Sequence, residues 1–158
     1  MCNSAVCHRC DLPFGRCWSH ANLNHATHAR LGDLFDGIHM NFLTHLSRMG
    51  AASSHHIRTN IPEFADLVSS ANLRQLAGLK ICFLSGGDNA VWQPAATKKS
   101  FDMFRHTFPD GKYERVVVQG YGHLDCWIGK NAHKDVYPRI EHHIQSCEHA
   151  LPSSRATS

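Results

Sequence analysis

The segment GYGHLDCW at residues 120–127 contains the side chain best placed for acid–base chemistry, His123. This histidine follows a predicted strand at 113–119 by a few residues and stands between a glycine and a leucine. Histidine is the side chain whose ordinary pKa lets it take up and release a proton near neutral pH. The chain has fourteen histidines. The position of His123 beyond a predicted strand, and not its residue type, therefore makes it the candidate.

In serine hydrolases built on a parallel sheet, the histidine comes last in chain order and a carboxylate orients it. Two candidates for that role lie in SGGDNAVWQP, residues 85–94. Asp88 is its one acid, whereas Asn89 stands where the phrasing Gly-x-x-Asp-x-apolar-x-x-Pro places the acid. An amide there can hold the ring but adds no charge, which costs about four decades in rate in the reference triad. Asp125 is a third candidate or a purely structural carboxylate, and the choice stays open.

No nucleophile accompanies these residues. The sequence contains no Gly-x-Ser-x-Gly elbow, and no strand is predicted before residue 79 that could lead into one. Ser85 comes nearest to the serine of this motif, but it lies at the end of the strand that is expected to supply the acid. We therefore expect no hydrolysis by this chain alone.

The first thirty residues hold several potential metal ligands: Cys2, Cys7, Cys10, Cys17, His20, His25 and His28. Four cysteines are enough for a tetrahedral zinc ion. However, no second Cys-x-x-Cys pair at zinc-finger spacing accompanies Cys7 and Cys10, and the histidines fit no standard spacing. The sequence favours ordinary thiols with no metal, and a small zinc-binding protein is the alternative.

The elements that must position His123 follow from hydrophobic patterns. A short apolar run at 79–84 predicts a buried strand, 113–119 predicts a second strand, and 94–107 predicts a helix between them with Pro94 at its start. A helix interrupted near Pro138 is predicted over 131–147. This order predicts an α/β fold in which the two strands are parallel neighbours, with chemistry beyond their carboxyl ends. Residues 21–50 are predicted to be helical in at least two pieces.

Composition excludes several classes of protein. Hydrophobic residues make up 42% of the chain and charged residues 18%, as in globular proteins. The net charge of +3 is scattered, so no nucleic-acid-binding surface is predicted. No apolar run approaches the roughly 18 residues of a membrane span. The seven cysteines are an odd number, which indicates reduced thiols and favours a cytoplasmic location.

Four segments together resemble the C-terminal α/β-hydrolase region of large cholesterol oxidase-like proteins: CNSAVCHRC, FGRCWSHANLNHATHARLGDLFDG, CFLSGGDNAVWQP and YERVVVQGYGHLDCWIGKNAHKDVYPRI. Those proteins join a flavin-dependent glucose-methanol-choline-type oxidoreductase module to a hydrolase-like module. The His-Leu-Asp segment is also similar to the corresponding loop of the acid lipases. The resemblance covers residues 2–148, nearly the whole chain.

The resemblance implies a partial α/β-hydrolase fold. Residues 1–60 would form a helical, lid-like part and residues 61–150 the C-terminal half of the core. The polar composition of the last residues, and not the resemblance, predicts a disordered tail at 151–158. His123 would match the lipase-type catalytic histidine and Asp125 the accompanying carboxylate. Asn89 occupies the place of the lipase acid.

The resemblance also implies a hydrophobic substrate, such as a lipid or sterol ester, and an upstream part of the same domain as a partner. The dinucleotide-binding Gly-x-Gly-x-x-Gly does not occur, so FAD would belong to a longer parent protein and no cofactor is expected in this chain. The alternative is a non-catalytic module that binds a hydrophobic ligand or supports a flavin oxidase.

Overall fold

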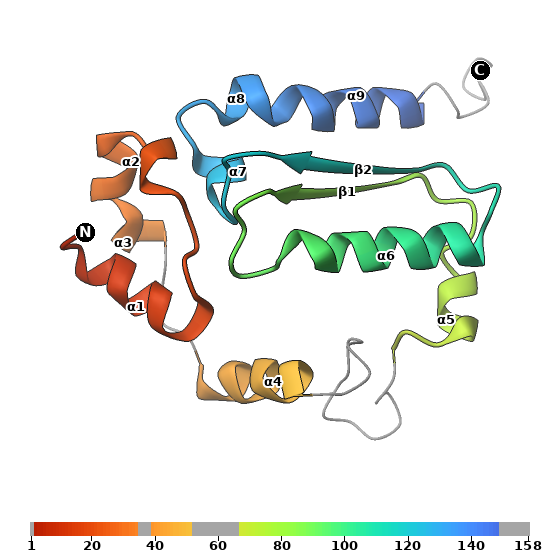
Figure 1. Cartoon of the computed structure of the whole chain (residues 1–158), viewed down its shortest axis with the longest axis horizontal. Helices are drawn as coiled ribbons and strands as arrows, with labels where there is room; N and C mark the ends of the chain where they lie inside the picture. Colours follow the sequence, from red (N-terminus) through yellow and green to blue (C-terminus); the bar gives the residue numbers. More distant parts are fainter. Residues whose placement is uncertain (1, 35–38, 52–66, 149–158) are drawn as a thin grey trace, which may run out of the picture.

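A pair of parallel strands forms the centre of the protein (Figure 1). The computed structural model describes residues 2–34, 39–51 and 67–148. Strand β1 (Ile81–Gly86) pairs in register with β2 (Tyr113–Val118), and helix α6 (Pro94–Thr107) connects them. The carboxyl ends of both strands therefore meet at one edge of the sheet, as the sequence predicts.

Aromatic side chains attach α6 to one face of the sheet. The ring of Phe104 lies 5.6 Å from that of Phe83 on β1 and 5.3 Å from that of Tyr113 on β2, measured between centroids. Pro94 occupies the first turn of α6, where its missing N–H costs no helical hydrogen bond. Its carbonyl accepts a 2.9 Å hydrogen bond from Arg115 on β2, which anchors the start of the helix to the sheet.

The other face of the sheet is covered by helices α8 (Ala132–Asp135) and α9 (Tyr137–Glu148). Figure 1 shows α6 and α9 on opposite sides of the two strands. A buried cluster joins these helices and the short helix α7 (Asp125–Ile128) to the strands: Val118, Tyr121, Cys126, Ala132 and Val136, with Leu84, Val116 and Ile140 packed against it. The two strands are thus sandwiched between helical layers.

The N-terminal residues form a second group of short helices beside the carboxyl edge of the sheet (Figure 1). These are α1 (Ala5–Phe14), η1 (His20–Asn22), α2 (His25–Ala29) and α3 (Leu31–Leu34). Their own core consists of Cys7, Cys17, Trp18, Leu23 and Leu31, and Val91, Leu124 and Ile128 from the sheet loops pack against it. The N-terminal helices therefore pack against the loops that carry Asn89 and His123. Helices α4 (Met40–Ala51) and α5 (Ser70–Arg74) complete the described elements.

The predicted mixture of helices with two parallel strands is confirmed. The first strand begins two residues later than predicted, at Ile81, and the helical segment over 131–147 divides at Val136 into α8 and α9. Helix α1 falls within the part at 1–60 that the resemblance implies to be helical; Pro13 lies inside the helix near its end and Gly15 caps it. The predicted tail at 151–158 lies outside the described residues. No described helix is both long and apolar enough for a membrane crossing.

Candidate functional site

The loops that follow β1 and β2 contact each other through their backbones. The backbone N–H of Gly87 donates to the carbonyl of Val118 at 2.8 Å, and that of Asp88 donates to the carbonyl of Tyr121 at 2.9 Å. A Cβ atom on Gly86 would lie 2.1 Å from the carbonyl oxygen of Gly122, so only glycine fits there. This close approach brings the side chains that follow the two strands together.

Asn89 and His123 are the two side chains that meet. The amide nitrogen of Asn89 lies 3.2 Å from Nδ1 of His123. Asn89 is buried and His123 is half-buried. Of the three residues considered for orienting the histidine, Asn89 is the one that forms a hydrogen bond with it.

Backbone contacts fix the orientation of the Asn89 amide. Its Oδ1 accepts hydrogen bonds from the N–H groups of Val91 (3.0 Å) and Trp92 (2.9 Å). The Nδ2 group therefore faces His123 as a donor, and Nδ1 of the ring must accept. Because a neutral imidazole carries one donor and one acceptor, its proton lies on Nε2. This is the opposite tautomer to that of a serine-hydrolase triad, in which Nδ1–H donates to a carboxylate and Nε2 accepts the nucleophile's proton.

The protonation of His123 is also constrained by its surroundings. Burial lowers the pKa of its imidazole below the ordinary value, and the negative charge of Asp125 opposes this to a smaller extent. A ring that is held neutral, with Nε2 protonated, is a hydrogen-bond donor at that nitrogen. It is not a base there.

The carboxylates of Asp88 and Asp125, unlike the amide of Asn89, form no hydrogen bond with His123. Asp88 is exposed, and within the described part of the chain no hydrogen bond joins its carboxylate to His123. Asp125 is fully buried, and its Oδ2 accepts from the side chain of Asn22 at 2.6 Å and from the backbone N–H of Gly122 at 2.9 Å. Asp125 therefore stabilises the shape of the loop that carries His123, which is the structural role weighed for it.

Residues 17–22 support the same loop from the N-terminal side. The carbonyl of Cys17 accepts from the N–H of Leu124 at 2.8 Å, and that of Asn22 accepts from Lys130 at 2.7 Å. The side chain of Asn22 also donates to the carbonyl of Gly120 at 2.7 Å. The sequence offers no local signal for these contacts, because they join residues about a hundred positions apart.

No described serine is hydrogen-bonded to His123. Ser85 is buried in β1, and its hydroxyl donates to the carbonyl of Gly86 at 3.0 Å. The Ser85 hydroxyl is therefore not placed to act as a nucleophile for His123.

A second group of chemically capable side chains lies among the N-terminal helices: Cys2, Cys7, His20 and His28. The zinc alternative considered from the sequence drew on four cysteines, Cys2, Cys7, Cys10 and Cys17. In the structure the Cys7 thiol lies beside that of Cys2, 3.6 Å away, and Cys17 faces the carbonyl of Gly15. All seven cysteines are free thiols.

A smaller group lies on the α9 side of the sheet and consists of Cys82, Glu114 and His143. The Nδ1 atom of His143 is 3.7 Å from a carboxylate oxygen of Glu114, and that carboxylate is half exposed. Three side chains with one exposed carboxylate make a weaker ligand set than the N-terminal four.

Comparison of the chain with protein-family models, curated protein sequences and solved structures gives no match.

Proposed function

We propose that these residues are the C-terminal part of an α/β-hydrolase-type domain of the kind found in cholesterol oxidase-like proteins. The observation that supports this most directly is the 3.2 Å contact between Asn89 and His123, which follow the carboxyl ends of two neighbouring parallel strands. In this architecture the acid and the histidine of the triad follow strands at that edge. The ancestral reaction would be hydrolysis of lipid or sterol esters.

The chain on its own is proposed to be inactive as an esterase. It contains no nucleophile elbow, and Asn89 holds His123 in the tautomer whose Nε2 cannot accept a proton. An amide in place of the acid lowers the rate by about four decades even when the rest of a triad is present. A serine would have to come from an upstream part of the domain, which would be the partner of these residues.

The side chains that would contact the ligand are hydrophobic. Trp92 and Trp127 lie in the segments that follow Asn89 and His123, and their side chains are about half exposed. Tryptophan is enriched at protein interfaces, because it combines a large apolar surface with a polar N–H group. These side chains support a hydrophobic lipid- or sterol-like substrate, with the N-terminal helices as its lid-like cover.

A non-catalytic module is the second candidate, and the Asn89 amide favours it. A domain that no longer needs ester hydrolysis can retain the fold and the half-buried His123 while losing the acid. Such a module would bind a hydrophobic ligand or support a flavin oxidase in a longer parent protein. FAD would belong to that parent.

A fluorogenic ester assay tests the proposal on the purified chain and its His123→Ala variant. We expect no turnover that depends on His123. Robust turnover that the variant loses would contradict the proposal. The upstream coding sequence is the second test: a strand followed by Gly-x-Ser-x-Gly supports the hydrolase lineage, whereas a dinucleotide-binding fingerprint with alanine or glycine at the nucleophile position supports the non-catalytic module.

A further inference from the structure

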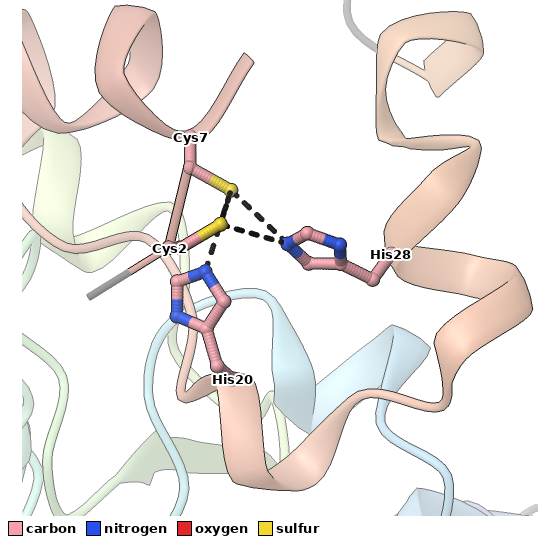
Figure 2. A group of neighbouring side chains, drawn as sticks. All are labelled: Cys2, Cys7, His20 and His28. Atoms are coloured by element: carbon pink, nitrogen blue, oxygen red, sulfur yellow. Dashed lines mark hydrogen bonds between the residues drawn. The ribbon is translucent and has the colours of Figure 1, made fainter. Parts of the chain in front are cut away.

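Four side chains from three short elements converge on one point among the N-terminal helices (Figure 2). Cys2 precedes α1 and Cys7 lies in its first turn, whereas His20 begins η1 and His28 lies in α2. Figure 2 shows the two thiols side by side, with the two imidazole rings directed at them from different sides. Their ligand atoms all lie within 4.8 Å of one another.

Four of the six distances between these atoms are close to the edges of a coordination tetrahedron. The two sulfur atoms are 3.6 Å apart, Nε2 of His28 is 3.3 Å from each sulfur, and Nε2 of His20 is 3.4 Å from Sγ of Cys7. With Zn–S bonds of about 2.3 Å and Zn–N bonds of about 2.0–2.1 Å, a tetrahedral site requires roughly 3.8 Å between two sulfurs and roughly 3.6 Å between sulfur and nitrogen. These four distances are within a few tenths of an ångström of the required values, and the other two, from the ligand atom of His20 to those of Cys2 and His28, are at most 4.8 Å.

The residue types fit the same ion. Two thiolates and two neutral imidazoles form the Cys2His2 set that structural zinc sites use, and a tetrahedral arrangement of sulfur and nitrogen selects zinc among the common divalent ions. Two thiolates also balance the charge of Zn²⁺, which suits a place where Cys7 is 1% exposed. On binding, each thiol gives up its proton to solvent and its sulfur donates an electron pair to the metal, so no oxidant or reductant is needed.

We propose that the protein binds one structural zinc ion through four ligands: Cys2, Cys7, His20 and His28. All four positions of the tetrahedron are filled by protein, as in structural and not catalytic zinc sites. An open hollow lined by Cys2, His20 and His28 borders the site and provides a path for the ion.

The local structure explains why the ligands meet. Asn24 caps α2, since its side chain accepts from the N–H of Thr27 at 2.7 Å, and this sets where the helix begins and where His28 projects. Gly15 has a φ of 76°, which favours glycine, and it lets the chain turn back after α1 towards η1. These turns bring the four ligands together, although their spacing in the sequence does not match a zinc-finger pattern.

The zinc site would stabilise the support of the His123 loop. His20 opens η1, and η1 ends at Asn22, whose side chain bonds to Gly120 and Asp125. The ion would cross-link α1, η1 and α2, whose shared core has only five buried residues. A site of this kind supplies stability that so small a core cannot. This role is independent of the proposed hydrolase lineage.

Metal analysis of the purified, reduced, full chain tests the proposal. We expect one equivalent of zinc per chain, removed by a strong chelator and restored by added Zn²⁺. Addition of Co²⁺ in place of zinc should give the intense visible bands of tetrahedral cobalt together with a near-ultraviolet thiolate-to-cobalt band. Replacement of a ligand in Cys7→Ser or His28→Asn should weaken zinc binding by more than about 100-fold, beyond the 10–100-fold that loss of a group supporting a ligand costs.

Two matched variants serve as controls. Cys10→Ser changes another cysteine of α1, and His25→Asn changes a histidine of α2 that lines the same hollow. Both should retain one equivalent of zinc. The variant His20→Cys should also retain metal, with a stronger thiolate-to-cobalt band, because residue 20 would then supply a third sulfur. That result does not depend on the ligand-loss variants remaining folded.

Several outcomes would overturn the proposal. These are an absence of stoichiometric binding in the reduced protein, equal loss of zinc in Cys10→Ser and Cys7→Ser, and an unchanged cobalt spectrum in His20→Cys. A disulfide between Cys2 and Cys7 in the protein isolated without reductant, seen as a mass lower by two hydrogens, would also contradict a resident metal.

Discussion

The amide nitrogen of Asn89 points at Nδ1 of His123 from 3.2 Å, while the amide oxygen of Asn89 accepts two backbone hydrogen bonds from its own loop. The two backbone hydrogen bonds fix the orientation of the Asn89 amide and so give meaning to its contact with His123. Because the amide cannot rotate without placing its NH₂ group against two N–H donors, the contact defines which ring nitrogen carries the proton. A carboxylate at the same position would impose the opposite arrangement.

Replacement of Asn89 by Asp should therefore reverse the tautomer of His123. One carboxylate oxygen can accept from Val91 and Trp92, and the other then accepts from Nδ1–H of the ring. The added negative charge should also raise the pKa of His123 above that of the wild type. Nitrogen-15 NMR of the imidazole reports both changes. The variant Asp88→Asn, which changes the exposed neighbour, is the control, and an Nδ1–H tautomer already present in the wild type would disprove the assignment.

The stability of the protein should depend on the protonation of His123. Burial lowers the pKa of this ring in the folded state, so the unfolded chain binds the proton more readily. The contribution of His123 is therefore complete above its ordinary pKa of about 6.5 and decreases as the pH falls towards the lower folded value. Denaturant unfolding from about pH 8 to about pH 5 should show the wild type losing stability relative to His123→Gln.

The matched control for this measurement is His133→Gln, because His133 is exposed on α8. If His123→Gln and the wild type lost stability in parallel over the whole range, burial of His123 would have no energetic consequence.

Removal of the buried carboxylate in Asp125→Ala should destabilise the fold by about 3 kcal/mol. The change leaves the buried N–H of Gly122 without its acceptor, which costs about 1–3 kcal/mol, and it removes the charged one of the two acceptors of the Asn22 side chain, which keeps its bond to Gly120. The exposed Asp88→Ala is the control and should stay within about 0.5 kcal/mol of the wild type. The free energy of unfolding in denaturant measures both. Similar losses in the two variants would contradict the role assigned to Asp125.

Substitution of Gly86 by alanine should be among the most destabilising single changes, at about 3 kcal/mol. Its Cβ would lie 2.1 Å from the carbonyl oxygen of Gly122 and 2.3 Å from that of Tyr121, and two backbones cannot both move aside at a strand end. Gly120→Ala in the adjoining loop is the comparison. No atom lies within 4 Å of a Cβ there, so only its φ of 76° is strained, at about 1–2 kcal/mol. Thermal unfolding of both variants should rank them in this order.

The parts of the fold that the sequence predicts are those set by local patterns. An apolar run ending in glycine gives β1, Pro94 marks the start of α6, and the β–α–β order places the carboxyl ends together. The contact between Asn89 and His123 follows from that order, because both residues come a few positions after a strand. The choice among the candidate orienting residues does not follow from the sequence, since it depends on which side chain the loop turns towards the ring.

The features that the sequence does not predict depend on contacts between residues that are far apart in the chain. The role of Asp125 is defined by Asn22, which is 103 positions away. The N-terminal ligand group was obscured by the Cys7–Cys10 pair, which matches a familiar spacing although the structure pairs Cys7 with Cys2. Only the turn at Gly15 and the position of η1 bring His20 and His28 to the same thiols.

The bonds from Asn22 to Gly120 and Asp125 also affect the order of folding. They close chain segments 98 and 103 residues long, and the entropy lost in closing them is recovered only when both ends are already formed. The β–α–β unit requires no such distant partner. The loop around His123 should accordingly be the last region to become protected from hydrogen exchange during refolding and the first to open, and a chain shortened from its N-terminus would keep its strands while losing the shape of that loop.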